Sequence, residues 1–343
     1  MKEMNRPIFV STYTTGFQDQ VTSLLQKNLL HTTILDARDG ILFYTTKSRI
    51  QDVAKLPYVN NSFILLYESK HTHSKLPMFT EEVIKNSSQW IINLSILPWN
   101  LSYRVKWFIE NKPSSIPITM TRNLENSISK RYKNYHVDIN NPAYELRISL
   151  RKWEKGVCLF RITKKNAQKW LEKGELRPEF AYLISSFTYF NWNDVILEPF
   201  TGYWAIPKII AQHFPYKTLI VNDIDKHRIA HCKKTLKDKG DNIIFLNEDA
   251  LHFSQIHDTE INHIVTDPPW WLFERLLPNK ETFYEKAIQE MKRILKSGGT
   301  LTICTAQKEI TQKLLQKYDF TIHQEIHTLV SGKKVAVYFT QKP

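Results

Sequence analysis

A stiff turn with acceptor groups and aromatic rings follows one apolar stretch of the chain. After the apolar run at 261–266, the sequence continues Asp267-Pro268-Pro269-Trp270 within VTDPPWWLFE. Prolines cannot continue a central strand, because they donate no hydrogen bond to the sheet and fix φ. We therefore expect a strand to stop at Asp267 and to leave a rigid turn, poor in donors, at its carboxyl end. Ligands bind at that edge of an open α/β sheet, so this turn is a candidate site if the surrounding chain forms such a sheet.

Three other apolar runs also end in residue types that suit a nucleotide-like ligand. The three run ends read Glu198-Pro199-Phe200-Thr201-Gly202, Asn222-Asp223-Ile224-Asp225 and Asn247-Glu248-Asp249-Ala250. A glycine lets the backbone approach a ligand closely, and an acid in the position of Asp223 can accept both hydroxyls of a ribose. Asp249 suits the exocyclic amine of an adenine. One acid after a strand is weak evidence, because acids also cap helices. Acids at the ends of four successive strands favour a ligand-binding edge.

The elements that must position these residues alternate in the second half of the chain. Strands are predicted at 195–200, 218–223, 242–250, 261–270 and 300–306, and helices at 206–214, 225–240 and 283–299, the last two ending at glycines. The tail at 320–340 is predicted to form two antiparallel strands around Ser331-Gly332. Strands that alternate with amphipathic helices are typical of a doubly wound, Rossmann-like α/β sheet.

The first half has a different pattern, typical of α+β units. Apolar strands are predicted within 7–13, 33–46 and 62–68, and a second group begins after His71–Pro77 with helices at 79–92 and 121–134 and strands at 101–110, 144–153 and 156–165. We therefore predict three domains, at 1–72, 78–170 and 171–343.

Composition excludes several classes of protein. Hydrophobic residues make up 42% of the sequence, but no apolar run is long enough for a membrane span, and no signal peptide is evident at the N-terminus. The three cysteines are far apart and form no CxxC pair, which argues against a disulfide frame, a zinc site or an iron–sulfur cluster. His227 and His231 could share a helix face, but no third ligand accompanies them. We expect a cytoplasmic, metal-free monomer.

The net charge of +13 is concentrated in one half. Residues 1–170 contain 25 Lys and Arg against 13 Asp and Glu, whereas residues 171–343 contain 22 against 21. A basic half of this kind predicts contact with a polyanion. The alternative is a surface of ordinary solubilising lysines.

The strand ends together resemble those of class I S-adenosylmethionine-dependent methyltransferases, and in particular the RNA guanine-N2 group. That group carries a DPFxGxG-like first loop, a DID sequence after the second strand, an acid after the third and a D/N-P-P-Y/F/W turn. The stretch YHVDINNPAYELRISL at 135–150 resembles a THUMP domain, and 1–72 is similar to the ferredoxin-like domain that precedes THUMP in the transfer RNA guanine-N2 methyltransferases. Leu176-Arg177-Pro178 resembles the junction that opens their catalytic domain.

This resemblance implies an enzyme that methylates an exocyclic base amine, most simply N2 of a guanosine in tRNA. The cofactor would be S-adenosylmethionine, and the implied cofactor-binding residues are Glu198, Phe200, Thr201, Gly202, Asp223, Ile224, Asp249, Ala250 and Asp267. The implied catalytic residues are Asp267, Pro268, Pro269 and Trp270. An exocyclic amine is a poor nucleophile because its lone pair is delocalised into the ring. The Asp267 side chain and the Pro268 carbonyl can accept both amine protons, and Trp270 can stack on a flipped or single-stranded base.

The basic first half would hold the RNA through its backbone. Candidate contacts are Lys130, Arg131, Lys133, Arg151, Lys152, Arg161, Lys164 and Lys165. Such contacts position an RNA without reading its bases. The alternative for each residue is a solvated face.

Three positions depart from the family pattern. Glu198 replaces the usual leading Asp, Trp204 lies where the first loop normally has a small residue, and Trp271 replaces a frequent glycine. Bulk at Trp204 could block the cofactor pocket, so a non-catalytic RNA-binding protein on a methyltransferase scaffold is the alternative. The turn also occurs in adenine-N6 DNA methyltransferases and in a glutamine-N5 enzyme that acts on release factors. An rRNA guanine-N2 methyltransferase remains a further alternative, but the basic THUMP-like half favours structured RNA.

Overall fold

The structure is a computed structural model that describes residues 7–72, 75–90, 94, 97–98, 100–110, 112–150, 155–162, 174–237, 242–270 and 279–343. The chain divides into two compact units. The first consists of Met1–Tyr13 and Val21–Lys169, and the second of Thr14–Gln20 and Trp170–Pro343.

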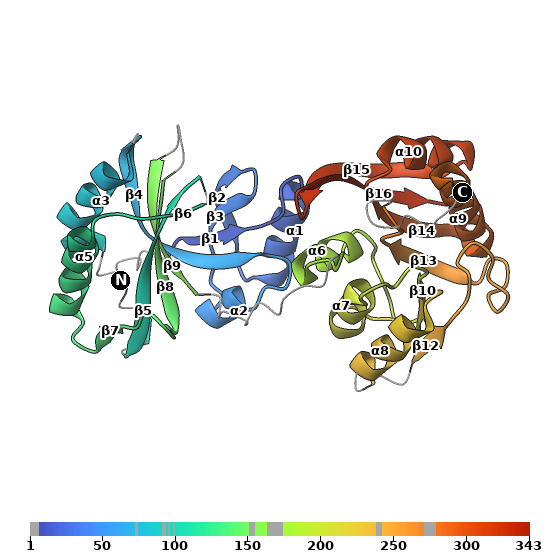
Figure 1. The fold of residues 1–343 in the computed structure, drawn as a ribbon, viewed down its shortest axis with the longest axis horizontal. Coiled ribbons are helices and arrows are strands. Elements are labelled where there is room, and N and C mark those ends of the chain that lie inside the picture. Colours follow the sequence, from blue (N-terminus) through green and yellow to red (C-terminus); the bar gives the residue numbers. More distant parts are fainter. Residues whose placement is uncertain are drawn as a thin grey trace. The chain divides into compact units, whose positions relative to one another are not determined.

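One sheet runs through the first unit in the order β2-β3-β1-β4-β9-β8-β5-β6, with β7 paired to β5 (Figure 1). Its strands are β1 (Phe9–Thr12), β2 (Thr33–Arg38), β3 (Ile41–Thr45), β4 (Asn61–Thr72), β5 (Leu101–Ile109), β6 (Lys112–Ser114), β7 (Tyr135–Val137), β8 (Tyr144–Leu150) and β9 (Lys155–Arg161). The long strand β4 pairs antiparallel with both β1 and β9, so the stretches before and after residue 75 contribute to one sheet. Strand β5 runs parallel to β8 and β7.

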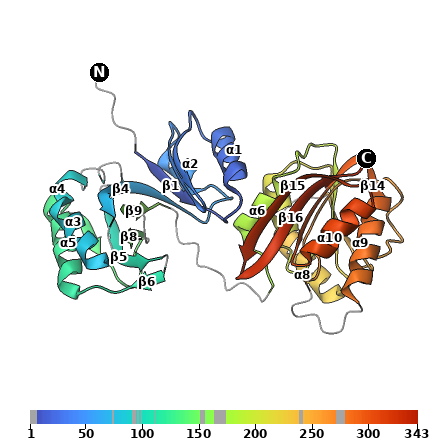
Figure 2. The same ribbon diagram turned by 90° about the horizontal axis from the view of Figure 1, so that it is seen from above.

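Helices cover one face of the β4–β9–β8–β5 part of this sheet. The helices of the first half are α1 (Gln18–Asn28), α2 (Ile50–Ala54), α3 (Leu76–Lys85), α4 (Ser87–Trp90) and α5 (Ile118–Arg131). Figure 2 shows α3 and α5 side by side against these strands. The contact is close, because a Cβ added at Gly156 of β9 would lie 2.6 Å from the Phe79 ring of α3. Leu146, Ile148 and Leu150 of β8 are buried on this side.

The second unit is a Rossmann-like α/β layer structure. Its strands are β10 (Val195–Glu198), β11 (Thr218–Asn222), β12 (Ile243–Leu246), β13 (Ile261–Thr266), β14 (Leu295–Thr305), β15 (Thr321–Val330) and β16 (Lys333–Gln341). They lie in the order β12-β11-β10-β13-β14-β16-β15, and all pairs are parallel except those of β16. The predicted α/β class and the antiparallel tail around Ser331-Gly332 are confirmed. A sheet whose order reverses beside β10 places a ligand crevice at the carboxyl ends of β10 and β13.

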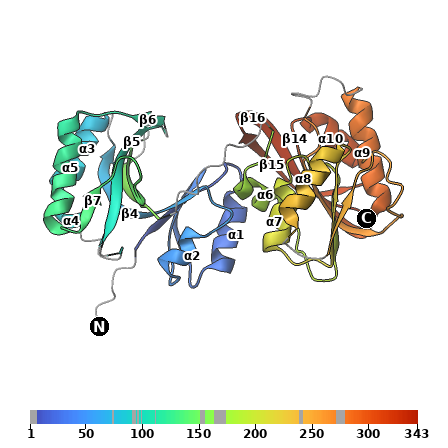
Figure 3. The same cartoon turned by 60° about the horizontal axis from the view of Figure 1, so that its bottom comes forward.

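Helices flank both faces of this second sheet. They are α6 (Pro178–Ser185), α7 (Ala205–His213), α8 (Lys226–Leu236), α9 (Lys280–Ile294) and α10 (Lys308–Lys317). Figure 3 shows α6, α7 and α8 along one face, and α9 and α10 along the other. The apolar stripe of α9 (Tyr284, Ala287, Ile288, Met291) joins Leu197, Ile264 and Leu301 of the strands in one buried cluster.

Two helix predictions were wrong in their extent. The helix predicted at 283–299 ends at Ile294, and Leu295–Gly299 already belongs to β14. Gly299 is therefore not a helix stop, since a Cβ there would lie 2.9 Å from the Asn262 and Lys296 carbonyl oxygens, so the glycine allows close strand contact. The helix predicted at 79–92 is broken at Asn86 into α3 and α4. The predicted elements at 91–92, 151–153, 163–165 and 238–240 lie outside the described residues.

Candidate active site

Four strands of the second sheet bring their carboxyl ends to one edge. Strand β10 runs parallel to β11 and β13, and β11 runs parallel to β12. Glu198, Asp223, Asp249 and Asp267, which follow or end these strands, therefore lie along the same edge. The sequence predicted this alignment.

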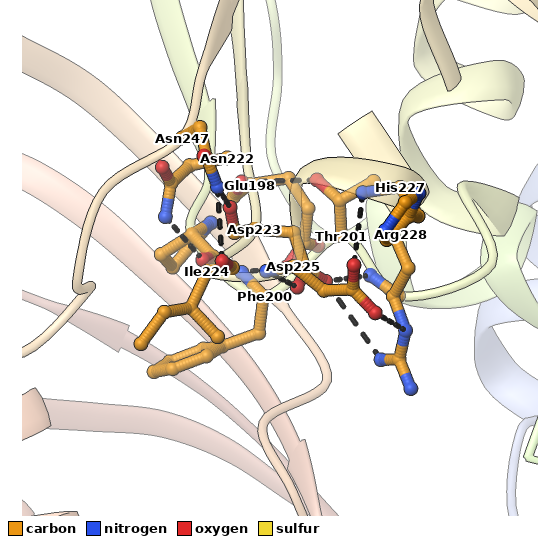
Figure 4. A network of polar contacts seen from close by, with 12 residues as sticks. Glu198, Phe200, Thr201, Asn222, Asp223, Ile224, Asp225, His227, Arg228 and Asn247 are labelled. Carbon is orange, nitrogen blue, oxygen red and sulfur yellow. Dashed lines mark hydrogen bonds and ion pairs between the residues drawn. The ribbon is translucent and has the colours of Figure 1, made fainter. Parts of the chain in front are cut away.

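Two asparagines tie the strand ends together. The buried Asn222 amide donates to the Pro199 and Glu248 carbonyls at 3.0 and 3.1 Å, and its oxygen accepts the Glu248 N–H at 2.9 Å. Asn247 donates to the Asp223 and Ile224 carbonyls at 2.8 and 2.9 Å. Figure 4 shows this network between the ends of β10, β11 and β12. The loops that carry the acids are therefore held at fixed spacing before any ligand binds.

Asp223 is held as an acceptor rather than as a helix cap. Its Oδ2 accepts the Gly202 N–H at 2.8 Å and its Oδ1 accepts the Asp225 N–H at 2.9 Å. The N-cap of α8 is Asp225, which accepts the His227 N–H at 2.8 Å. Gly202 has φ +52, a left-handed conformation that favours glycine. Each carboxylate oxygen of Asp223 keeps a further lone pair, so the pair of hydroxyls of a ribose fits this carboxylate.

Glu198 has a buried oxygen that no described residue satisfies. The side chain is 1% exposed, and its Oε1 accepts the Thr266 hydroxyl at 2.8 Å and the Phe200 N–H at 3.0 Å. Its Oε2 is buried and has no hydrogen-bond partner among the described residues. Burial raises the pKa of Glu198 well above its usual range, hydrogen bonds from Thr266 and Phe200 oppose this, and the Asp267 and Asp223 charges add to it. An orphaned carboxyl oxygen at the first strand end fits the ammonium group of an amino-acid cofactor.

The bulk of Trp204 is directed at a helix. Its indole stacks on the His231 ring of α8, with centroids 4.1 Å apart and planes 15° apart. The residue has φ +55, which is strained for a tryptophan, and its carbonyl accepts the first turn of α7 through the Lys208 N–H at 3.0 Å. From the sequence, His231 could share a helix face with His227 as a metal ligand. In the structure its ring packs against Trp204.

Asp249 lies further out than the other acids. Its side chain is exposed, and its Oδ1 accepts the Leu251 N–H at 3.0 Å to close a turn, whereas Ala250 is buried beneath it. Ile224, in the loop that follows β11, presents a side chain that is 72% exposed. An exposed apolar side chain and a carboxylate on neighbouring loops suit the face and the amine of a purine.

Among the described residues, one carbonyl of the turn after β13 receives no hydrogen bond. The Pro269 carbonyl accepts the Tyr284 hydroxyl at 2.9 Å, and the Trp270 carbonyl accepts the Gln307 amide at 2.7 Å. The Pro268 carbonyl has no hydrogen bond to any residue that the structure describes. Proline rings fix the direction of this carbonyl, so it is a preformed acceptor beside the Asp267 carboxylate.

The side chains of the same turn are also fixed. The Trp270 indole N–H donates to Asp267 Oδ1 at 2.6 Å, so the ring is oriented by the acid that it follows. Cys304 of β14 interacts with the same acid: burial raises the pKa of its thiol well above its usual range, and the Asp267 carboxylate raises it further. The thiol therefore stays protonated and donates toward Asp267. Trp271 lies outside the described residues.

Several residues of this site were not identified from the sequence. Tyr284 of α9 also lies 2.7 Å from the Thr305 hydroxyl, which in turn accepts the Gln307 N–H at 2.9 Å. Cys304, Thr305 and Gln307 all lie at the carboxyl end of the fifth strand, so the rule applied to the other four strands would have identified them. Tyr284 comes from a helix face, and no local pattern marks it.

The candidate RNA contacts divide between two places in the first unit. Lys130 and Arg131 end α5, Lys133 follows them, and all three are exposed beside a hollow lined by Leu97 and Lys130–Tyr135. Arg161 ends β9 and lies on the sheet. Arg151, Lys152, Lys164 and Lys165 lie outside the described residues.

The described part of the chain contains neither a metal-ligand cluster nor a helix that could span a membrane. No three His, Cys, Asp or Glu side chains in these ranges gather closely enough to hold a metal ion. None of the helices described combines the length and apolar character needed to cross a bilayer.

Comparison with known proteins gives a family for the second unit and a fold for the whole chain. Residues 192–338 match the family described as Methyltransferase small domain, and no curated protein matches the chain. TrmN from Thermus thermophilus is 18% identical and covers 98% of this chain and 100% of its own, with a TM-score of 0.77. The structure of SMU.472 complexed with SAH is 13% identical over 99% of both chains, with a TM-score of 0.70.

A predicted N6-adenine-specific DNA methylase from Listeria monocytogenes str. 4b F2365 is also similar. It is 14% identical and covers 99% of this chain and 97% of its own, with a TM-score of 0.71. At these identities the likeness shows a shared fold along the whole chain. The family match identifies 192–338 as a methyltransferase domain, and the chain is an enzyme that uses S-adenosylmethionine.

Proposed function

We propose that this enzyme methylates an exocyclic amine of an RNA base, with N2 of a guanosine in tRNA as the target. The observation that carries the proposal is the open Pro268 carbonyl beside Asp267, in a turn whose next two carbonyls are both occupied. Two acceptors of this kind bind the two protons of an NH₂ group. The similarity in fold to TrmN along 98% of the chain supports the proposal.

S-adenosylmethionine, when bound, supplies an electrophilic methyl group on a sulfonium sulfur. We propose that the ribose hydroxyls bind to Asp223, and the ammonium group to Glu198. Ile224, Asp249 and Ala250 would surround the adenine, and Phe200, Thr201 and Gly202 would line the methionine side. The acids needed for this arrangement lie at one edge, and the buried Glu198 Oε2 is the atom that most needs such a partner.

The turn prepares the amine for reaction. Asp267 and the Pro268 carbonyl would hold the two amine protons and draw the nitrogen lone pair out of conjugation with the ring, toward the methyl group. After transfer the nitrogen carries an extra proton, which the Asp267 carboxylate can accept. Since the prolines and the Trp270–Asp267 bond fix these groups in advance, little order is lost when the base binds.

The first unit is the proposed RNA-binding part. We propose that 1–72 is a ferredoxin-like domain, that 78–170 is a THUMP domain and that 171–343 is the catalytic domain. The excess of 12 positive charges in residues 1–170 supports RNA binding there. A base inside a duplex cannot reach the turn, so the target nucleotide would be flipped or single-stranded.

The test is tritiated methyl transfer to RNA from a strain that lacks this gene, followed by nucleoside analysis. We expect N2-methylguanosine, and we expect Asp267→Ala to abolish transfer while the affinities for S-adenosylmethionine and RNA stay nearly unchanged. The loss appears in kcat, because the acceptor is needed as the amine becomes nucleophilic. Asp319→Ala is the matched control, since this acid forms only a surface pair with Lys292.

Each other outcome has a definite meaning. N6-methyladenosine as product would retain the turn mechanism and refute the base assignment. RNA binding without any methylated nucleoside or cofactor binding would favour the non-catalytic alternative. Full activity of Asp267→Ala would refute the mechanism.

A further inference from the structure

Five charged side chains gather on one face of the sheet in the first unit. They are Arg104 and Lys106 of β5, Glu145 and Arg147 of β8, and Arg161 of β9; we call this group the basic cradle. Strand pairing places Glu145 opposite both Arg104 and Arg161, and places Lys106 opposite Arg147. Opposed residues share a face and side chains alternate along each strand, so all five point to the same side.

This side is the one away from the helices. Gly156 of β9 faces α3, because a Cβ there would meet the Phe79 ring. Arg161 is five residues further along the strand and therefore points to the opposite face. The basic cradle thus lies on the face that α3 and α5 leave uncovered (Figure 2).

The charges of the basic cradle do not balance. Its single acid, Glu145, has a side chain that is 9% exposed, with Lys106 Nζ at 3.0 Å and Arg104 Nη2 at 3.6 Å from its Oε2. Among the described residues, the three cations Arg104, Lys106 and Arg161 share this one carboxylate, which leaves them with a local charge of +2. The Arg147 guanidinium carbon lies over the Phe108 ring, 3.8 Å from its centroid, in a cation–π contact.

Arg161 and Arg104 keep unused donors. The Nε atoms of both arginines are buried, and neither has a hydrogen-bond partner among the described residues. Burial lowers the pKa of Arg161, Glu145 opposes this, and the charge of Arg104 lowers it further. A partly buried guanidinium without its own counter-ion is costly, and a buried donor without a partner requires an explanation, of which a bound anion is one.

We propose that the basic cradle is a phosphate-binding site that holds a phosphodiester of the RNA substrate. Guanidinium groups match the geometry of phosphate oxygens, and strand register places Arg104 and Arg161 opposite the same residue, Glu145, on its two neighbouring strands. A phosphate there would satisfy their free donors and offset the excess charge. The source of the phosphate rests on the proposed function, whereas the anion site itself does not.

The first experiment measures the binding of unfractionated tRNA to the full chain at several salt concentrations. Arg161→Gln should weaken binding on the order of 10-fold and lower the slope of log K against log salt by about 1. The double variant, Arg104→Gln with Arg161→Gln, should lower this slope by about 2. Arg161→Lys should keep most of the slope, since it keeps the charge. Lys85→Gln is the matched control, because Lys85 is an exposed cation on α3. An Arg161→Gln effect no larger than that of Lys85→Gln would overturn the proposal.

The second experiment separates this proposal from the proposed function. Inorganic phosphate, compared with chloride at equal ionic strength, should raise the melting temperature of the wild type more than that of the double variant. Equal stabilisation of both would refute the cradle. If the wild type methylates tRNA and the cradle variants bind it normally, only the cradle is wrong. If cradle variants lose both tRNA and phosphate binding but no RNA is ever methylated, the cradle is supported and the proposed function fails.

Discussion

Removing the Tyr284 hydroxyl of α9 tests whether its hydrogen bond positions the turn that contains Asp267 and Pro268. Tyr284 is fully buried, and its hydroxyl donates to the Pro269 carbonyl at 2.9 Å and lies 2.7 Å from the Thr305 hydroxyl. Tyr284→Phe keeps the ring and leaves the Pro269 carbonyl without its donor. We expect this change to release the peptide that follows Pro269 and so to shift the neighbouring Pro268 carbonyl, the proposed acceptor of the amine.

The magnitude follows from one lost buried hydrogen bond. Leaving a buried carbonyl unsatisfied costs about 1–3 kcal/mol, and each kcal/mol lowers the melting temperature of a domain of this size by about 2–4 °C. The effect on the rate of methyl transfer should exceed the effect on stability, because a shift of about 1 Å in a reacting group can lower the rate about 100-fold. We therefore expect kcat to fall about 10- to 100-fold, with the S-adenosylmethionine affinity nearly unchanged.

Tyr338→Phe is the matched control. Tyr338 belongs to the same buried cluster, and its hydroxyl donates to the Lys308 carbonyl at 3.1 Å without contacting the turn. Methyl transfer kinetics and thermal unfolding are measured for both variants. The control should lose stability but keep kcat. Gln307→Glu provides a second test, because it preserves size and replaces the donor to the Trp270 carbonyl with a repelling carboxylate.

An equal loss of kcat in Tyr284→Phe and Tyr338→Phe would show that general loosening of the core is responsible. Unchanged kcat in both Tyr284→Phe and Gln307→Glu would refute the idea that these residues position the turn.

Two further predictions concern the cofactor edge. Burial raises the pKa of Glu198 well above its ordinary 4.5, so the folded state holds this proton more tightly than the unfolded state does. The associated stability is present below pH 4.5 and is lost as the pH rises through the raised pKa. Glu198→Gln should flatten this decline in unfolding free energy above pH 4.5, and identical pH profiles of the wild type and the variant would refute the prediction. Because a cofactor ammonium favours the ionised form, wild-type affinity for S-adenosylmethionine should rise over the same range in calorimetry, and that of the variant should not. Trp204→Gly removes the stacking of the indole on His231 but relieves the strain of a positive φ at this position. The affinity for S-adenosylmethionine should therefore change by less than about threefold. A large gain in affinity would show that the indole obstructs the cofactor pocket.

The sequence alone specified the second unit well. Its alternation of apolar runs and amphipathic stretches is a local signal, and the carboxyl ends of parallel strands must meet at one edge, so Glu198, Asp223, Asp249 and Asp267 could be aligned without coordinates. The prolines at 268 and 269 have no donor and a fixed φ, which made the end of β13 predictable. The end of α9 was misjudged, because Gly299 serves a strand contact that depends on Asn262, a residue distant in sequence.

Tertiary structure decided which atoms of the site are occupied and which are free. The open Pro268 carbonyl is defined by donors from Tyr284 and Gln307, and the orphaned Glu198 oxygen by the burial of its surroundings. In the first unit, the sequence showed an excess of basic residues but not their grouping. Arg104, Glu145 and Arg161 come together only through strand register, and pairing between strands distant in sequence leaves no local pattern to read.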